Sequence, residues 1–254
     1  MTVVGLFHPG EMGSALGASL RSNGHDVLWA STGRSEETAA RARSAGLEDA
    51  GAVQDVAKRS DVLLSVCPPH AAADVATSFG SFRGIYVDAN AIAPATTAAV
   101  GGRFARYVDG GIIGPPPWEP GTTRLYLSGD DAPAVAGLFA GSHPEARVLS
   151  TTIGDASALK MVYAAWSKGT AALLLAIADV AKAQGVEAPL REEWDLSLPQ
   201  LPARLERAEA SADAKGWRWV AEMEEIAATF AATGSPDGFH RAAAEIFARR
   251  TPFR

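Results

Sequence analysis

The sequence predicts an α/β fold: a doubly wound parallel sheet, followed by an all-helical C-terminal domain with one long helix at the junction. Two observations indicate this fold. Up to about residue 115, short β-branched runs alternate with alanine-rich stretches, a pattern typical of parallel strands joined by helical crossovers. From residue 155 to 184, an alanine- and leucine-rich pattern continues without a proline. We therefore expect two domains, covering residues 1–153 and 154–254.

In the first domain, strand-like runs follow one another along the chain. The expected strands cover residues 1–7, 26–30, 61–66, 85–88, 106–109, 125–129 and 146–150, and the first two helices cover residues 14–23 and 35–45. The runs at 61–66 and 85–88 are mostly apolar, as strands covered on both faces require. Ligands bind at the carboxyl ends of such parallel strands, so functional residues are expected just after these runs.

The second domain is expected to be built around the long helix. Larger side chains recur there every three or four residues, at Leu159, Tyr163, Trp166, Thr170, Leu173 and Ile177. Gly185 is a suitable residue to end this helix, and further helices are expected over residues 200–212, 217–232 and 238–249. A small domain around so apolar a helix would expose much apolar surface on its own. We therefore expect a homodimer that forms through the C-terminal helical domain.

The composition restricts the partners. Lys and Arg number 23 against 29 Asp and Glu, a net charge of −6, which argues against binding to nucleic acid or an anionic membrane. The one cysteine, Cys67, cannot form an internal disulfide, which fits a reducing cytoplasm. The apolar run at 171–178 is too short to span a bilayer, and the N-terminal run is interpreted as a strand, not a signal peptide. The histidines have no metal-ligand spacing, so no metal is expected.

The turn behind the first strand is the first candidate site. A dinucleotide-binding turn has the pattern G-x-G-x-x-G, in which the second glycine lets the backbone approach the pyrophosphate and the third lets the helix pack against the strand. This chain has His8-Pro9-Gly10-Glu11-Met12-Gly13 there. Gly10 and Gly13 remain, while Pro9, whose φ is fixed, can supply the turn by rigidity. The motif alone leaves open whether His8 donates to a phosphate or fills space, and whether the turn binds a cofactor at all.

The end of the second strand bears on the choice of cofactor. NAD is usually recognised here by an acidic side chain that binds the adenine ribose 2′-hydroxyl. This chain instead has Ser31, Thr32 and Arg34, with no carboxylate before Glu36. Small hydroxyl groups and a guanidinium suit a 2′-phosphate. NADP(H) is therefore preferred over NAD(H), the alternative being a solvated turn without a ligand.

Five motifs occur in order along the chain. They are Gly10-x-Met12-Gly13, Gly24-His25-x-Val27, Val66-Cys67-Pro68-Pro69, Val87-Asp88-Ala89-Asn90 and Gly154-Asp-Ala-Ser-Ala-Leu-Lys160. With this order and spacing, the chain resembles the β-hydroxyacid dehydrogenase and 6-phosphogluconate dehydrogenase superfamily. The first four motifs cover a Rossmann-type NADP-binding domain, and the fifth is similar to the start of the family's long interdomain helix. The tail, at 217–232 and 239–246, resembles a little-characterised C-terminal domain of some members.

The resemblance implies hydride transfer between a nicotinamide and a carbinol carbon, with Lys160 as the general acid/base. A lysine can take this role if burial and a nearby positive charge favour its neutral form. The backbone of the glycine turn would hold the pyrophosphate. The implied cofactor-binding residues are His8, Pro9, Gly10, Glu11, Met12, Gly13, Ser31, Thr32, Arg34, Cys67, Pro68, Pro69 and Asn90.

Two departures from the family pattern concern the substrate. Ala164 stands where members usually have an asparagine one turn after the lysine, and Ile113 stands where the loop at 109–117 usually has a serine. The loss of an amide and a hydroxyl favours a small, fairly apolar substrate. Its expected contacts are Ile113, Gly114, Tyr163 and Trp166.

Two alternatives remain open. The run at 107–117, followed by the strand at 125–129, resembles the matching loop of imine reductases, which reduce C=N with NADPH in an apolar pocket. Those enzymes generally carry aspartate or tyrosine instead of the lysine, so Lys160 favours carbonyl and alcohol chemistry. The other alternative is a catalytically silent NADP(H)-binding or sensor protein that kept the fold and lost the site, which His8 and Ala164 favour.

Overall fold

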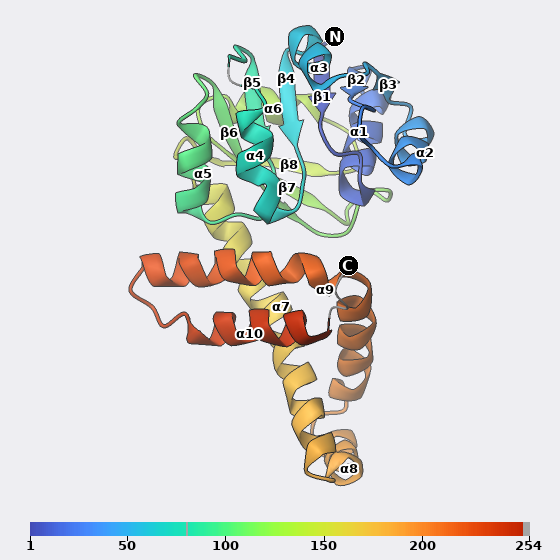
Figure 1. Ribbon diagram of the computed structural model, residues 1–254, viewed down its shortest axis with the longest axis vertical. Coiled ribbons are helices and arrows are strands. Elements are labelled where there is room, and N and C mark those ends of the chain that lie inside the picture. Colours follow the sequence, from blue (N-terminus) through green and yellow to red (C-terminus); the bar gives the residue numbers. More distant parts are fainter. Residues whose placement is uncertain (80, 251–254) are drawn as a thin grey trace. The chain divides into compact units, whose positions relative to one another are not determined.

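The computed structural model describes residues 1–79 and 81–250. The chain forms two compact units, Met1–Lys160 and Met161–Arg254. Helix α7 (Asp155–Ala183) starts in the first unit and continues into the second (Figure 1). The expected domain boundary, between residues 153 and 154, lies just before this helix, whereas the two units divide within it.

The first unit contains an eight-stranded sheet with the order β3-β2-β1-β4-β5-β6-β7-β8. The strands are β1 (Val3–Leu6), β2 (Asp26–Trp29), β3 (Glu48–Asp49), β4 (Val62–Ser65), β5 (Ile85–Asp88), β6 (Tyr107–Ile113), β7 (Arg124–Ser128) and β8 (Glu145–Ser150). Strands β1 to β6 are parallel, which confirms the predicted doubly wound sheet. The chain runs outwards from β1 to β3 and then returns to β4 on the other side of β1. The carboxyl ends of β1 and β4 therefore form the switch point at which such sheets bind ligands.

Strands β7 and β8 differ from the expected all-parallel arrangement. Strand β7 pairs antiparallel with β6, and β8 pairs parallel with β7. Residues 114–123 connect β6 to β7 by turns and bends. A connection without a crossover helix suits an antiparallel pair, whereas parallel neighbours need a longer crossover.

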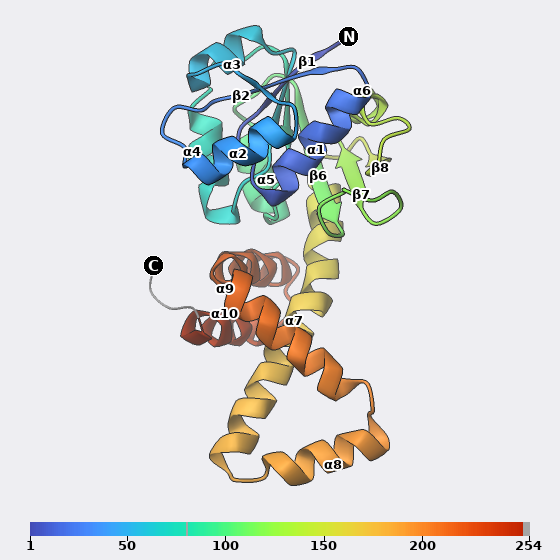
Figure 2. The ribbon, with the colours of Figure 1, turned by 90° about the vertical axis from the view of Figure 1, so that its right-hand side faces the viewer.

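Helices cover both faces of the sheet (Figure 2). They are α1 (Glu11–Ser22), α2 (Glu36–Ser44), α3 (Val53–Arg59), α4 (Ala72–Thr77), α5 (Pro94–Gly101) and α6 (Ala132–Leu138), with a 3-10 turn, η1 (Pro69–Ala71). Successive side chains of a strand point to opposite faces. Leu64 accordingly packs in one apolar core with Leu6 and Leu16, while its neighbour Leu63 packs in a second core with Phe7. The sheet is thus buried on both faces, as its apolar strands predict.

The second unit consists of the rest of α7 with α8 (Glu187–Ser197), α9 (Leu201–Ala232) and α10 (Gly238–Arg250). Helices α9 and α10 pack together, with the rings of Trp219 and Phe247 5.0 Å apart. The two helices expected at 200–212 and 217–232 form the single helix α9, because a glycine such as Gly216 costs a helix only about 1 kcal/mol. Helix α8 was not expected, since only Trp194 among its residues is buried and its apolar periodicity is weak.

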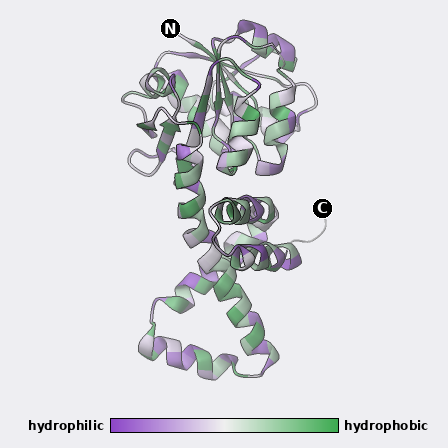
Figure 3. Ribbon diagram, turned by 90° about the vertical axis from the view of Figure 1, so that its left-hand side faces the viewer, coloured by the Kyte–Doolittle hydropathy of each residue, from purple (hydrophilic) through white to green (hydrophobic). Residues whose placement is uncertain are grey.

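Helix α7 is 29 residues long and is apolar enough to cross a membrane by length and composition, although core helices of soluble proteins pass the same test. The apolar run at 171–178 is only part of it, and Figure 3 shows the helix to be largely hydrophobic along its length. Within the second unit, the Lys168 ammonium of α7 lies 2.7 Å from the Glu222 carboxylate of α9, and both side chains are mostly buried. This ion pair ties the middle of α7 to α9.

Candidate functional site

The turn between β1 and α1 lies at the switch point of the sheet, and its two glycines have different surroundings. A Cβ at Gly13 would lie 2.1 Å from the carbonyl oxygen of His8, so only glycine fits where the helix crosses the turn. A Cβ at Gly10 would meet nothing within 4 Å. Gly13 therefore allows close packing, while Gly10 faces open space. This is the division of roles that the second and third glycines of a dinucleotide-binding turn have.

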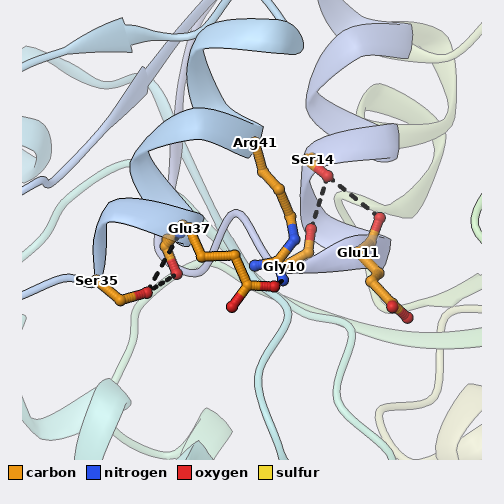
Figure 4. A network of polar contacts seen from close by, with 7 residues as sticks. Gly10, Glu11, Ser14, Ser35, Glu37 and Arg41 are labelled. Carbon is orange, nitrogen blue, oxygen red and sulfur yellow. Dashed lines mark hydrogen bonds and ion pairs between the residues drawn. The ribbon is translucent and has the colours of Figure 1, made fainter.

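Helix α1 presents its N-terminus at this turn. Gly10 is the N-cap and supplies no side-chain cap, and its carbonyl oxygen accepts hydrogen bonds from the backbone N–H and the hydroxyl of Ser14, at 2.9 and 2.7 Å. Helix geometry leaves the first N–H groups without intrahelical acceptors, at the positive end of the helix dipole. Such a terminus is suited to bind a phosphate. Figure 4 shows this first turn of α1 beside Ser35, Glu37 and Arg41.

His8 and Arg34 lie together at the same turn. The ring Nδ1 of His8 is buried and has no hydrogen-bond partner in the described part of the chain. Burial, and secondarily the charge of Arg34, lowers the pKa of His8 to about 4, so the imidazole is neutral at neutral pH. The Arg34 guanidinium donates to the carbonyl oxygen of Phe7 at 3.3 Å. His8 and Arg34 therefore flank the N-terminus of α1. His8 contributes a neutral imidazole that can donate one hydrogen bond, and Arg34 contributes a positively charged guanidinium.

Ser31, Thr32 and Arg34 were expected at a 2′-phosphate, but the side chains of Thr32 and Arg34 bind different parts of the chain. The backbone N–H and the hydroxyl of Thr32 both donate to the carbonyl of Gly51, at 3.1 and 3.0 Å, so this hydroxyl hydrogen is already used. The Ser31 carbonyl accepts from the Arg34 backbone N–H at 3.0 Å in a tight turn. The Arg34 side chain points back to β1. The structure thus groups Arg34 with the glycine turn and not with Thr32.

Cys67 and Asn90 are brought together at the ends of β4 and β5. The Asn90 side chain accepts from the Cys67 backbone N–H at 2.6 Å and donates to the Ser65 hydroxyl at 3.0 Å. Burial raises the pKa of the Cys67 thiol to about 12, so the thiol is protonated at neutral pH. Pro68 then caps the 3-10 turn η1, which begins at Pro69. These residues shape the edge of the switch point.

Asp109 is a buried carboxylate that was not predicted as a functional residue. Its Oδ1 accepts from the hydroxyls of Ser157 at 2.6 Å and Thr97 at 3.5 Å. Its Oδ2 accepts from the Ser128 hydroxyl at 2.9 Å and from the backbone N–H groups of Gly154 and Ser157 at 3.1 and 2.9 Å. An aspartate within an otherwise apolar strand was the available signal, because a buried charge must be hydrogen-bonded. These contacts fasten the start of α7 to β6.

Lys160 lies close to β6, because the start of α7 is held against this strand. A Cβ at Gly111 would be 2.6 Å from the carbonyl oxygen of Ala156 and 3.1 Å from the Cβ of Lys160. The first turns of α7 therefore pass directly over a strand glycine. Lys160 is partly exposed and is the last residue of the first unit.

The stretch at 109–117 was expected to be a loop, and this is wrong for its first half, which is strand; its contact with a substrate stays a prediction. Gly110 and Gly111 lie inside β6, and Ile113 is the last residue of that strand, with 5% of its surface exposed. Ile113 pairs with Arg124 of β7. The loop begins only at Gly114, which has a φ of +132° and a Cβ position 2.4 Å from a backbone oxygen of residue 122, so it must be glycine.

A cavity of about 490 Å³ lies between α1, α2 and this loop. Glu11, Ser14 and Arg41 line it from the helices, and Pro116 and Trp118 line it from the loop. The Trp118 side chain is 53% exposed. This aromatic residue therefore lies beside the N-terminus of α1.

Tyr163 and Trp166 lie on the part of α7 that belongs to the second unit. Their exposed fractions are 48% and 66%, whereas Ala164 is fully buried. A contact of either aromatic side chain with a substrate stays a prediction. Among the residues that the structure describes, no group of three or more His, Cys, Asp or Glu side chains is arranged to hold a metal.

Known proteins match both ends of the chain. The family model described as NADP oxidoreductase coenzyme F420-dependent matches residues 3–91, and the model described as a domain of unknown function, DUF1932, matches residues 181–250. An uncharacterised 28.5 kDa protein encoded in the 7S RNA 5′ region of Methanothermus fervidus is 31% identical over 186 residues, which is 72% of each chain.

Solved structures match nearly the whole chain. A conserved protein of unknown function, MTH1747, described as structurally similar to 3-hydroxyacid dehydrogenases, is 30% identical over 98% of this chain and 96% of its own, with a TM-score of 0.70. The fold is shared with 3-hydroxyisobutyrate dehydrogenase of Salmonella typhimurium (17% identity, 98% and 94% coverage, TM-score 0.71). It is also shared with the NADPH complex of a reductive aminase of Aspergillus terreus (20% identity, 98% and 93% coverage, TM-score 0.61). This chain therefore belongs to the same family as the Methanothermus fervidus protein and MTH1747, within the β-hydroxyacid dehydrogenase and 6-phosphogluconate dehydrogenase superfamily.

Proposed function

We propose that this chain is an NADPH-dependent oxidoreductase acting on a small, fairly apolar carbonyl or alcohol substrate, with Lys160 as the general acid/base. The observation that carries the proposal is the glycine turn at the switch point, where Gly10 faces open space and Gly13 is closely packed. Membership of a superfamily that includes hydroxyacid dehydrogenases supports it. Bound NADPH would supply the hydride, or its oxidised form would accept one.

The residues at the turn fit a dinucleotide. The backbone N–H groups of Gly10, Glu11, Met12 and Gly13 would hold the pyrophosphate at the N-terminus of α1. The buried ring nitrogen of His8 has no partner in the described chain, and a neutral imidazole can donate to a phosphate oxygen. Pro9 fixes the turn that presents these groups. Cys67, Pro68, Pro69 and Asn90 would line the path to the nicotinamide at the ends of β4 and β5.

The preference for NADPH over NADH depends on the end of β2. No acidic side chain follows β2 before Glu36, whereas Ser31, Thr32 and Arg34 do. The guanidinium of Arg34 would pair with the 2′-phosphate. Its hydrogen bond to the Phe7 carbonyl also supports a contact with the pyrophosphate, and the two roles predict different cofactor selectivity.

The Nζ of Lys160 would exchange a proton with the oxygen atom of the substrate. In the reductive direction it would give a proton to the carbonyl oxygen, and in the oxidative direction it would take the hydroxyl proton. Its place on α7 is set by the hydrogen bonds of Asp109 to Ser157 and Gly154 and by the close approach of α7 to Gly111. Ile113, Gly114, Tyr163 and Trp166 would contact the substrate.

A second candidate is reduction of C=N with NADPH. The shared fold with a reductive aminase that binds NADPH favours it, together with the apolar Ile113 at the end of β6. Reduction of an imine delivers a proton to nitrogen in place of oxygen, and it does not require Lys160 if another group or water supplies that proton.

Fluorescence titration with NADPH and NADH is the first test, and binding of NADPH is expected. If neither cofactor binds, the proposal fails. If NADPH binds, hydride transfer is measured with ketones, hydroxy acids and cyclic imines. Lys160→Ala should abolish turnover of ketones while Lys182→Ala, an exposed lysine on the same helix, should not. Turnover of imines that survives Lys160→Ala would favour the second candidate, and binding without any turnover would favour a sensor.

We also propose a homodimer that forms through α7. Exposed apolar side chains recur along this helix at Tyr163, Trp166, Leu173 and Val180, with exposed fractions of 48%, 66%, 45% and 61%. Thr170 and Ile177 fill the intervening positions, so the spacing alternates between three and four residues. This is the repeat of helices that pack along a seam.

A further inference from the structure

The geometry points to a second binding site, within the second unit and between α7 and α9, for the oxyanion group of a small molecule. Its ligand would be a phosphate or a carboxylate joined to a few carbon atoms. The inference does not depend on the proposed hydride transfer, because every residue that forms the site lies within the second unit.

The site is a cavity of about 210 Å³. It is lined by Ser167, Thr170, Ala171, Leu174, Arg204, Arg207, Ala208, Ser211 and Trp219. At a share of about 30 Å³ for each water in the liquid, this volume equals that of roughly seven waters. It can therefore hold an oxyanion with a small organic group.

The two helices contribute in the same way. The lining residues of α7 stand at 167, 170, 171 and 174, and those of α9 at 204, 207, 208 and 211. Both sets have the spacing of one helical face. Ala171 and Ala208 leave the space between the helices unfilled, and Trp219 forms a wall farther along α9. The hollow thus results from small residues on two facing helical stripes.

The charge of the cavity is positive. Arg204 and Arg207 are its charged lining residues, and among the described residues no carboxylate pairs with either one. Two like charges three residues apart on a helix repel each other. Lys168 lies over the Trp219 ring and pairs with the Glu222 carboxylate at 2.7 Å. The cavity therefore retains two positive charges.

Four other arginines of this unit, Arg191, Arg241, Arg249 and Arg250, are paired with acidic side chains, whereas Arg218 lies over the ring of Trp217. Arg191 lies 3.4 Å from Glu187, and Arg249 lies 3.8 Å from Glu245. Arg250 pairs with Asp179. The two arginines of the cavity differ from these, because the groups around them are hydroxyls, methyl groups and an indole. Arg204 is half-buried and Arg207 is exposed, so both guanidinium groups are accessible to an anion from outside the chain.

The chemistry of the lining indicates which anion fits. Guanidinium groups bind phosphate and carboxylate oxygens through paired N–H donors. The hydroxyl of Ser211 lies on the same face of α9 as both arginines and can add a donor. The hydroxyl of Thr170 already donates to the Trp166 carbonyl at 2.7 Å, so Thr170 lines the cavity without offering its hydroxyl hydrogen to a ligand. The Trp219 ring and Leu174 offer apolar surface to the carbon part of the ligand.

Calorimetric titration of the full chain with inorganic phosphate and, separately, with benzoate tests the proposal, at an ionic strength held constant with sodium chloride. Saturable binding of at least one probe is expected, and the stronger probe identifies the oxyanion. Arg204→Gln and Arg207→Gln should each weaken that binding about tenfold, since each removes a charged hydrogen-bond donor. Arg249→Gln, an exposed arginine on α10, is the matched control and should bind as the wild type does.

Ser211→Leu fills the cavity without removing charge and should also abolish binding, with the thermal unfolding midpoint of every variant recorded as a check on folding. The proposal is overturned if neither probe saturates, or if Arg249→Gln weakens binding as much as the cavity variants do. If neither probe binds and the double variant Arg204→Gln/Arg207→Gln loses self-association in sedimentation, the arginines pair with a carboxylate of a second copy and not with a small anion.

Discussion

Ser157 donates two hydrogen bonds to Asp109, from its backbone N–H to Oδ2 at 2.9 Å and from its hydroxyl to Oδ1 at 2.6 Å. Ser157 lies in the first turn of α7, and Asp109 lies in β6. A carboxylate that accepts from the first N–H groups of a helix is also stabilised by the helix dipole. The pair therefore fixes the start of α7 on the sheet, three residues before Lys160.

Asp109→Asn should lower the free energy of unfolding by about 3 kcal/mol, because the amide would direct a donor at groups that are themselves donors. Urea unfolding measures this change. Asp130→Asn, at an exposed position before α6, is the control and should change stability by less than about 0.5 kcal/mol. Turnover of the folded Asp109 variant should fall more than its affinity for NADPH, since Lys160 would be displaced. An unchanged unfolding midpoint would contradict this assignment.

Gly10→Ala and Gly13→Ala form a matched pair with opposite expected results. Gly13→Ala should cost about 2 kcal/mol or more of stability, because its Cβ would meet the His8 carbonyl oxygen. Gly10→Ala should leave stability unchanged, because its φ of −72° is ordinary and its Cβ meets nothing. Its methyl group would still occupy the approach to the pyrophosphate, so NADPH binding should weaken about tenfold or more. Wild-type affinity in Gly10→Ala would place the phosphates elsewhere.

Arg34→Ala distinguishes the two roles of this guanidinium. If it binds the 2′-phosphate, the variant should lose about tenfold more affinity for NADPH than for NADH. Fluorescence titration of both cofactors gives the ratio, with Arg43→Ala as a control on the exposed surface of α2. An equal loss for both cofactors would assign Arg34 to the pyrophosphate, which its hydrogen bond to Phe7 would explain.

His8 should make stability depend on pH. Its pKa is lowered from 6.5 to about 4 in the folded chain, so between these values the unfolded chain binds a proton that the folded chain does not. Stability contributed by the neutral ring is therefore complete above about pH 6.5 and is lost as the pH falls toward 4. With allowance for solvent screening of a partly exposed ring, the loss is about 2 kcal/mol.

The difference between the wild type and His8→Gln isolates this contribution, because other titrating groups cancel. Urea unfolding at about pH 7 and about pH 4.5 should show the wild type losing more stability than the variant. Equal losses in both proteins would mean that the ring is accessible to protons in the folded chain.

Much of the first unit could be predicted from the sequence, for a physical reason. Strands buried on both faces need apolar side chains throughout, so the strands at Val62–Ser65 and Ile85–Asp88 were recognisable as central ones. The reversed direction of β7 could not be predicted, because a strand has the same side-chain pattern in either direction. The start of α7 at Asp155 was predicted to the residue, whereas α9 was divided in two at a glycine that its packing tolerates.

The candidate site was predictable in part. Gly10 and Gly13 were assigned from spacing alone, and their surroundings agree with those roles. Gly110 and Gly111 were interpreted as a loop, because glycine pairs usually mark turns, but they lie in a buried strand where α7 passes over Gly111. No local pattern reveals that approach. Arg34 likewise follows β2 in sequence, but its side chain returns to β1, a direction that only the folded chain determines.

The exposed seam on α7 predicts how the chain associates. Leu173→Arg places a charge in the middle of the seam formed by Tyr163, Trp166, Leu173 and Val180, and a charge buried without a partner at an interface is strongly unfavourable. The variant should therefore be monomeric in sedimentation equilibrium where the wild type is a dimer. Leu196→Arg, on α8 at a position with 83% exposure, is the control and should remain dimeric. A wild type that sediments as a monomer at all concentrations, or a Leu173→Arg variant that still dimerises, would show that α7 is not the interface.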